Sequence, residues 1–179
     1  MSHSHPSPGD GVLETERLLL RRWRVSDATV HRELWTERDS RVPPHRRIDA
    51  DGHPTIEDLE EHIRQGGTDP AVGLLVAERR GSGDAIGYCG LIPNVHGQDD
   101  EPELAYEFLR EVWHQGYATE AARAVLDWAR ESGFRHLWAT IREWNAPSRR
   151  VADRLGFVQT DRVEADAAYG DSLFYRKDL

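Results

Sequence analysis

Apolar residues recur at two spacings along the chain, which separate the expected helices from the expected strands. Four stretches carry the spacing of three or four residues that gives a helix one apolar face. They cover about residues 27–37, a run that follows Thr55, a run from Ala118 to Gly133, and a run that begins at Asn145 or Ser148 and ends at Gly156. Ser26–Asp27 and Thr55 are typical helix starts and glycine is a typical helix end, so we predict about four helices.

Shorter apolar runs lie between these stretches and are typical of strands: residues 17–23, 72–78, 85–92, 103–109, 137–141, 157–160 and 173–176. The turn RRGSGD separates the second and third runs and predicts a hairpin. Leu104 and Tyr106 alternate with Glu103, Ala105 and Glu107, as in a strand with two different faces. The pattern predicts one α/β domain, residues 13–179, with a mixed sheet of about seven strands covered by helices.

Composition narrows the functional classes. The chain has 179 residues, a net charge of −9, six tryptophans and a single cysteine, Cys89. The acidic balance argues against nucleic acid as a partner, and no apolar run approaches the roughly 18 residues of a membrane span. One cysteine forms no disulfide within a chain, so we expect a cytoplasmic protein. Residues 1–12, rich in Ser, Pro, Gly and His, are expected to be a disordered tail.

The histidines do not indicate a metal site. There are nine, and none stands in an H-E-x-x-H arrangement or a similar pair on one helix face. We therefore expect no catalytic metal, and we expect His31, His62, His114 and His136 to be surface residues.

One stretch points to an anion. Trp113-His114-Gln115-Gly116-Tyr117-Ala118 joins the strand at 103–109 to the third helix. Gly116 permits a close backbone approach, and the first N–H groups of a helix carry the positive end of its dipole. A diphosphate would fit such a turn, although Gly116 as a tight turn and Ala118 as a packing residue explain it equally well. The turn has neither the Walker nor the dinucleotide pattern, which argues against nucleotide hydrolysis and hydride transfer.

The order of these motifs is more specific than the turn alone. TERLLLRRW, IGYCGLI, ELAYEFLREVWHQGYATEAARAVLDWA and SGFRHLWATIREWNAPSRRVADRLGF follow one another over about residues 14–178. Together they resemble the GNAT superfamily of acyl-CoA-dependent N-acyltransferases, and most of all its ribosomal-protein N-terminal acetyltransferase subgroup. The resemblance implies a mainly antiparallel sheet that splays after the fourth strand. The family's loop reads Gln/Arg-x-x-Gly-x-Gly/Ala, and here Trp113 replaces the first residue.

The resemblance also implies a site for acetyl-CoA. The backbone of the loop would bind the diphosphate, through His114, Gln115, Gly116, Tyr117, Ala118 and Thr119. The N–H of Phe108 would meet the acyl carbonyl, and the backbone near Leu109 would meet the pantetheine arm. Asn145 matches an asparagine that bonds the pantetheine. Arg123, Arg149 and Arg150 are candidates for the phosphates, although exposed helical arginines are usually just solvated.

The chemistry needs a group that accepts the amine proton and one that supplies a proton to the thiolate. Glu103 matches a glutamate of the subgroup and is the first candidate base, and a solvated strand end or an arginine partner is the structural alternative. Glu107 ranks second. The tyrosine that many members carry on the fourth helix is replaced by Ala152, so Ser148, which matches a serine of the subgroup, and the tyrosines Tyr106 and Tyr117 are the remaining donors. Asn145 and Ser148 are equally suited to capping the helix.

The acceptor is less well defined. We expect a primary amine, either a protein N-terminus or a small molecule, bound between the first two helices, the 41–56 loop and residues 165–172. Acidic residues near that loop could attract a cation: Asp39, Asp49, Asp51, Glu57 and Asp58. Arginines at 41, 46 and 47 could instead pair the carboxylate of a larger acyl group such as succinyl. The sequence is also compatible with a non-catalytic acyl-CoA binder or a purely structural domain, and with either a monomer or a homodimer.

Overall fold

The chain forms one mixed sheet with helices on both faces. A computed structural model describes residues 13–66, 73–97 and 100–179. The strands are β1 (Leu13–Glu14), β2 (Leu18–Arg21), β3 (Leu74–Arg79), β4 (Ala85–Ile92), β5 (Glu103–Phe108), β6 (His136–Arg142), β7 (Val158–Glu164) and β8 (Ser172–Asp178). The helices are α1 (Ala28–Glu37), α2 (Ile56–Arg64), α3 (Tyr117–Glu131) and α4 (Ala146–Leu155). The predicted mixed fold with four helices is confirmed, and the expected tail at 1–12 lies outside the described residues.

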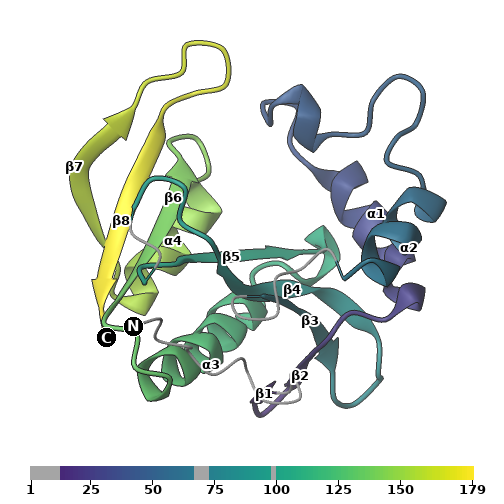
Figure 1. Cartoon of the computed structure of the whole chain (residues 1–179), viewed down its shortest axis with the longest axis horizontal. Helices are drawn as coiled ribbons and strands as arrows, with labels where there is room; N and C mark the ends of the chain where they lie inside the picture. The colour runs from purple at the N-terminus through teal and green to yellow at the C-terminus, as the bar shows by residue number, and fades with distance from the viewer. Residues whose placement is uncertain (1–12, 67–72, 98–99) are drawn as a thin grey trace.

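The sheet is divided in the middle. Its strand order is β1-β2-β3-β4-β5-β6-β8-β7, and every neighbouring pair is antiparallel except β5 and β6. The register of that parallel pair is defined at one position, Glu103 opposite Trp138. Beyond this point β5 and β6 diverge (Figure 1). The splay predicted after the strand at 103–109 is therefore present.

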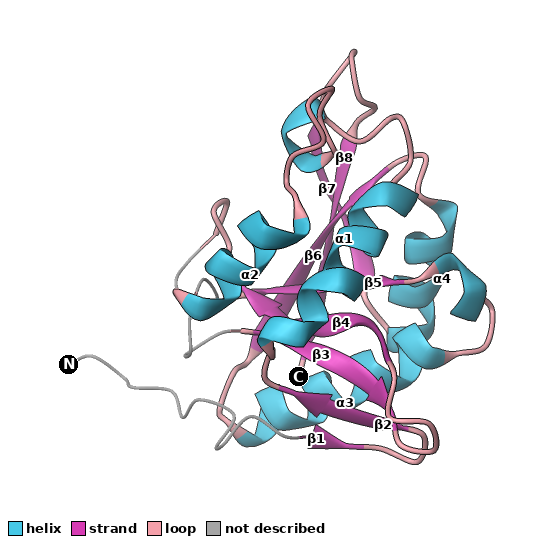
Figure 2. Cartoon of the chain, turned by 90° about the vertical axis from the view of Figure 1, so that its right-hand side faces the viewer, coloured by secondary structure: helices cyan, strands magenta, loops and turns pink. Residues whose placement is uncertain are grey.

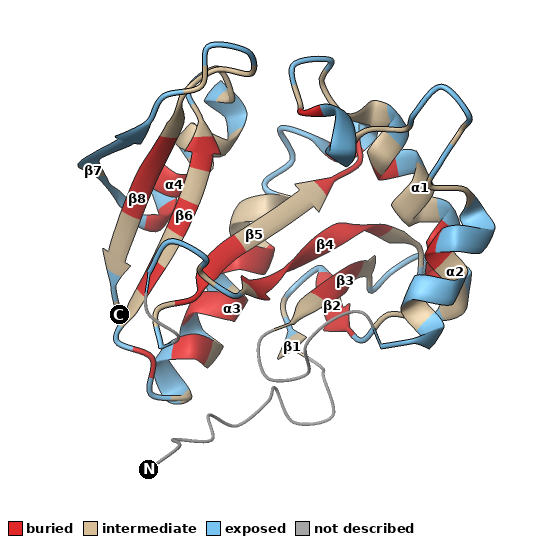
Figure 3. Cartoon of the chain, turned by 45° about the horizontal axis from the view of Figure 1, so that its top comes forward, coloured by how far each residue is buried: buried red, intermediate tan, exposed pale blue. Residues whose placement is uncertain are grey.

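The two faces of the sheet are covered by different helices. Tyr88 of β4 stands opposite Glu107 of β5, and the Glu107 carboxylate contacts Arg38 directly after α1. Tyr106, the residue before Glu107 on β5, points to the opposite face of the sheet, and its hydroxyl donates to the carbonyl of Ser148 in α4. Figure 2 shows α1 and α2 on one side of the central strands and α3 on the other. The buried residues form one cluster through the middle of these layers (Figure 3).

Two strands differ from the sequence-based expectation. β1 is an eighth strand of only two residues at one edge of the sheet, which is too short to give a period in the sequence. β7 extends to Glu164 rather than ending near residue 160. Six of its seven residues are exposed, so its outer half lacks the apolar alternation by which a half-buried strand is recognised.

Buried charged groups join β2 and β3 to the start of α1. The Arg21 guanidinium donates to both oxygens of Asp27, at 2.7 and 2.9 Å, and also to Glu78 of β3. Asp27 accepts the Arg24 N–H as well. Asp27 therefore does more than begin the helix as the sequence predicted, because its side chain joins β2 to the start of α1. Burial alone would raise the pKa of Asp27, but the bonds from Arg21 and Arg24 hold it below its usual value.

We predict that Asp27→Ala strongly destabilises the fold. The substitution leaves the buried Arg21 with only Glu78 as a counter-charge, and removing one partner of a buried pair costs roughly 3–5 kcal/mol. Urea unfolding at pH 7 should show the loss, and exposed Asp161→Ala should show little. Since the folded pKa is lowered, the contribution of Asp27 should disappear as the pH falls through that pKa. Equal stability of the two variants at pH 7 would contradict this.

Candidate active site

The start of α3 presents backbone N–H groups at one end of the sheet. β5 ends at Phe108, a short turn at Arg110–Val112 follows, and α3 starts at Tyr117. Gly116 is the residue before the helix and has φ of 85°, in the left-handed region that favours glycine. It has no side chain that could occupy the first amides of α3, which carry the positive end of the helix dipole. The turn can therefore bind an anion.

Two side chains shape the loop before Gly116. The Trp113 indole donates to the Phe108 carbonyl at 2.7 Å, and the Gln115 amide donates to the Glu111 carbonyl at 3.0 Å. His114 also has a positive φ, 62°, which is uncommon for a residue with a side chain. Trp113, which departs from the family pattern, thus ties the loop to the end of β5. Its neighbours His114, Gln115 and Gly116 are exposed, whereas Ala118 packs against the core.

The backbone of β5 faces the gap in the sheet. Leu109 donates its N–H to Ile86 of β4, and bonding alternates along an antiparallel pair. The N–H groups of Phe108 and Tyr106 therefore point away from β4, toward the side where β6 has diverged. The Phe108 carbonyl, which the Trp113 indole reaches, lies on that same side. Phe108 and Leu109 are both buried, and Leu109 uses its N–H on Ile86 and its carbonyl on the Val112 N–H, so of these two residues only Phe108 directs an N–H into the gap. The expected contact of the pantetheine arm with the Leu109 backbone therefore has no free Leu109 group to rest on.

Glu103 lies where β5 and β6 are still paired. It is 8% exposed, which contradicts the interpretation of this residue as a solvated strand end. Burial raises the pKa of its carboxyl, and the Thr140 backbone and the nearby charges of His96 and Arg162 oppose that rise. A carboxylate held in this way is suited to accept a proton near neutral pH.

Glu107 is on the same face of β5 but has different partners. The Arg38 guanidinium donates to both of its oxygens, at 2.8 and 2.6 Å, and the Tyr88 hydroxyl donates to it at 2.7 Å. The Arg38 side chain is 8% exposed. Glu107 is thus a permanently paired carboxylate that anchors the end of α1, which supports its lower rank as a base.

Residues of α4 meet β5 across the gap. The Tyr106 hydroxyl donates to the Ser148 carbonyl at 3.2 Å, and burial raises the pKa of Tyr106. The Asn145 side chain accepts the Ser148 N–H at 3.2 Å and so caps α4, as its residue type allows. The structure therefore brings Tyr106 and Ser148 together and places Asn145 beside them.

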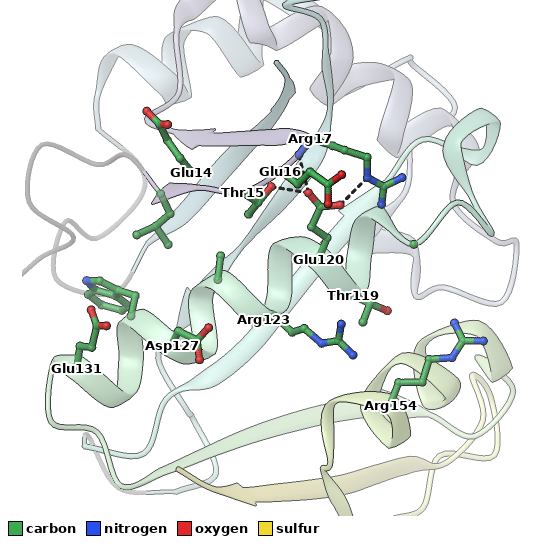
Figure 4. A pocket seen from close by; sticks show the side chains of 14 residues that line it. Glu14, Thr15, Glu16, Arg17, Thr119, Glu120, Arg123, Asp127, Glu131 and Arg154 are labelled. Atoms are coloured by element: carbon green, nitrogen blue, oxygen red, sulfur yellow. Dashed lines mark hydrogen bonds and ion pairs between the residues drawn. The ribbon is translucent and has the colours of Figure 1, made fainter. Parts of the chain in front are cut away.

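A groove of about 760 Å³ runs along α3. Its lining includes Gly116, Thr119 and Arg123 of the loop and α3, and Arg154 of α4 (Figure 4). Arg154 was not among the residues expected from the sequence, because only the packing of α4 beside α3 brings it there. Arg149 instead donates to the Tyr175 hydroxyl and the Glu143 carbonyl, and Arg150 is exposed on α4 outside the groove lining.

One histidine was wrongly expected at the surface. The His31 ring lies tilted against Trp23 and edge-on to Trp35, with centroid distances of 4.8 and 6.4 Å, and its Nδ1 is buried without a hydrogen-bond partner among the described residues. Burial, the first cause, and the Arg38 charge lower its pKa to about 4, so it is neutral at pH 7. Within the described residues, no three His, Cys, Asp or Glu side chains group as metal ligands, and no helix there is long and apolar enough to cross a membrane.

Comparison with known proteins agrees with this geometry. The family model of the acetyltransferase (GNAT) domain matches residues 17–158. The chain belongs to this family. The chain is 40% identical to YkkB of Bacillus subtilis (strain 168) over 86 residues. These residues are 48% of this chain and 50% of the relative, so the match spans about half of each protein. It is 26% identical over 152 residues, 82% of both chains, to the N-acetyltransferase p20 of Bacillus licheniformis.

Solved structures share the fold. A GNAT-family acetyltransferase from Bacillus anthracis superposes with a TM-score of 0.74 at 20% identity, covering 93% of this chain and 98% of the other. The putative acetyltransferase yncA of Salmonella typhimurium, solved with its cofactor acetyl-CoA, gives 0.65 at 20% identity, with 90% and 94% covered. A putative ribosomal-protein-serine acetyltransferase from Vibrio cholerae gives 0.71 at 16% identity, with 95% and 98% covered.

The family defines the enzyme class, an acyl-CoA-dependent acetyltransferase that uses acetyl-CoA. The residues present fit this donor. At Gly116 an added Cβ would lie 3.4 Å from the Arg17 guanidinium, so the glycine leaves room beside the first amides of α3. The gap between β5 and β6 exposes strand backbone that an extended amide-containing chain can bond.

We predict that Gly116→Ala weakens binding of acetyl-CoA. Gly133 just beyond α3 has a similar φ of 89°, and a Cβ there would meet nothing within 4 Å, so Gly133→Ala is a matched control. Both changes should cost about 1 kcal/mol of stability, since each puts alanine in the left-handed region. Only Gly116→Ala should raise the dissociation constant measured by calorimetry. Equal affinity of the two variants for acetyl-CoA would show that the turn has no role in binding.

Proposed function

We propose that the protein transfers the acetyl group of acetyl-CoA to a primary amine, by direct attack of the amine on the thioester while both substrates are bound. The observation that carries this proposal is the position of Glu103. It is a buried carboxylate with a raised pKa, at the point where β5 and β6 begin to separate, and by strand alternation it is on the same face of β5 as Glu107. The acetyl donor would enter from the α3 side of the gap, and the amine would approach from the opposite face.

Each requirement of the reaction has a candidate group. The Phe108 N–H, directed into the gap, would donate to the acyl carbonyl as negative charge develops on its oxygen. Glu103 would accept the proton that the attacking amine loses through a chain of water molecules, because it lies at the opposite end of β5 from Phe108, roughly 16 Å along the strand. Tyr106, whose raised pKa keeps its hydroxyl protonated, and Ser148 would be the proton donors nearest the departing thiolate. Position 152 of α4, where many family members carry a tyrosine, is a buried alanine, so α4 supplies no proton donor at that position.

The nature of the amine is the finer part of the proposal. A protein N-terminus is supported by resemblance to the ribosomal-protein subgroup, and a small amine is the other candidate. The acidic residues near the 41–56 loop favour a cationic acceptor less strongly than their number suggests, because several of them already have partners within the protein. Arg41 binds Asp39 through both carboxylate oxygens and lowers its pKa to about 2, Asp49 accepts N–H groups of its own turn, and the Asp58 carboxylate accepts the Thr55 N–H at the start of α2. These carboxylates are already occupied.

The state of the cysteine bears on the compartment in which the protein acts. We infer a cytoplasmic enzyme, because the one cysteine, Cys89, is a free and fully buried thiol whose pKa burial raises. A monomer and a homodimer remain equally compatible with the proposal.

We predict that Glu103→Gln reduces acetyl transfer by about 100-fold or more while acetyl-CoA still binds. Turnover measured against N-terminal peptides, polyamines and aminoglycosides would give the rate and the acceptor together. Because the folded pKa is raised, burying the charged carboxylate costs stability once the pH exceeds that pKa. The melting temperature of Glu103→Gln at pH 8 should therefore be no lower than that of the wild type.

Glu107→Gln is the contrasting variant. It leaves the buried Arg38 without its counter-charge, so it should lose stability. The acid limb of the pH profile should disappear in Glu103→Gln and remain in Glu107→Gln. Full turnover by Glu103→Gln would rule out Glu103 as the base. Acetyl-CoA binding without transfer to any amine would favour a non-catalytic acyl-CoA binder.

A further inference from the structure

Arg17 reaches the coenzyme loop from a distant part of the sequence. It precedes β2, yet its Nη1 donates to the Gln115 carbonyl at 3.0 Å and its Nε donates to Glu120 of α3 at 2.7 Å. Its guanidinium also lies 4.3 Å from the centroid of the Tyr117 ring. One side chain thus contacts the loop, the first residue of α3 and the first turn of that helix. Figure 4 shows its ion pair with Glu120.

Glu120 holds Arg17 in this position. Its Oε1 accepts the Thr15 hydroxyl at 2.6 Å and the Arg17 N–H at 2.9 Å, while its Oε2 accepts the guanidinium. Burial alone would raise the pKa of Glu120, but the bonds from Thr15 and Arg17 hold it below its usual value. The carboxylate is therefore charged at pH 7, and it fastens the first turn of α3 to the turn between β1 and β2.

The loop needs such support because its backbone conformation is unfavourable. His114 and Gly116 both have positive φ, and a residue other than glycine in this region costs energy unless its surroundings stabilise it. The Gln115 peptide lies between these two residues, and its carbonyl is the atom that Arg17 binds. Fixing that carbonyl toward the β1–β2 side limits the orientations of the peptide planes at the start of α3.

We propose that Arg17 is a positioning residue for coenzyme binding: it holds residues 113–116 in the conformation that directs the first N–H groups of α3 toward the diphosphate of acetyl-CoA. This inference rests on the proposed function, since it assumes that the loop binds the donor. The charge of Arg17 is largely balanced by Glu120, so the geometry of the guanidinium matters more than its charge. A lysine, with one point-like ammonium, cannot make the contacts to Gln115, Glu120 and Tyr117 together.

The test is calorimetry with acetyl-CoA on the wild type, Arg17→Ala, Arg17→Lys and Arg22→Ala. Arg22 is an exposed arginine just after β2 and controls for loss of one positive charge. Competition by inorganic pyrophosphate serves as a second readout of the loop itself, and thermal unfolding is recorded for every variant. Arg17→Ala and Arg17→Lys should both bind acetyl-CoA about 10- to 100-fold more weakly, with weaker competition by pyrophosphate, while Arg22→Ala binds as the wild type does.

Three results would overturn the inference. Wild-type affinity in Arg17→Ala would show that the loop needs no support, and wild-type affinity in Arg17→Lys would show that charge alone matters. An affinity loss that only follows a drop in melting temperature, with pyrophosphate competition unchanged, would show a purely structural role. Each of these results leaves the proposed function intact. Absence of acetyl-CoA binding by the wild type would instead refute the proposed function, and this inference with it.

Discussion

The separation of β5 from β6 is the constraint on which the rest of the site depends. Two parallel strands that stayed paired would use their backbone groups on each other, and the sheet would have no room for a substrate. Here the pair is registered at Glu103 and Trp138 and then opens. The opening leaves the Phe108 N–H unpaired with β6, between the helices that cover the two faces of the sheet. It also places Glu103 where buried and open regions of the sheet meet.

The remaining features of the site hold the ends of this opening in place. At one end the Trp113 indole binds the Phe108 carbonyl, and Arg17 and Glu120 fasten α3 to the β1–β2 turn. At the other face Arg38 and Tyr88 bind Glu107 and fix the end of α1. Two glutamates of one strand face thereby differ in environment. Glu107 accepts two bonds from the Arg38 guanidinium, whereas Glu103 is buried without an ion-pair partner among the described residues, and burial raises the pKa of Glu103.

Most of the fold could be predicted from sequence because helices and half-buried strands leave a period in the chain. Thr55 and Asp58 were readable as a capping pair, and the structure shows both of their reciprocal bonds. The exposed end of β7 and the two-residue β1 leave no such period. For the site, residues on one continuous stretch, such as 113–119, could be found from spacing. Arg17, Arg154 and Arg38 could not, because their contacts join segments far apart in the chain. His31 was misjudged for the same reason: its burial depends on Trp23 and Tyr88 as well as on its own helix.

A crystal structure of the protein with acetyl-CoA would test the central claim most directly. The account predicts that the diphosphate binds the N–H groups at the start of α3 beside Gly116, and that the thioester lies between β5 and β6. Its carbonyl oxygen should be within hydrogen-bond distance of the Phe108 N–H, with ordered water leading from the thioester to Glu103 at the other end of β5. A coenzyme bound elsewhere, with the gap between β5 and β6 closed, would contradict the account.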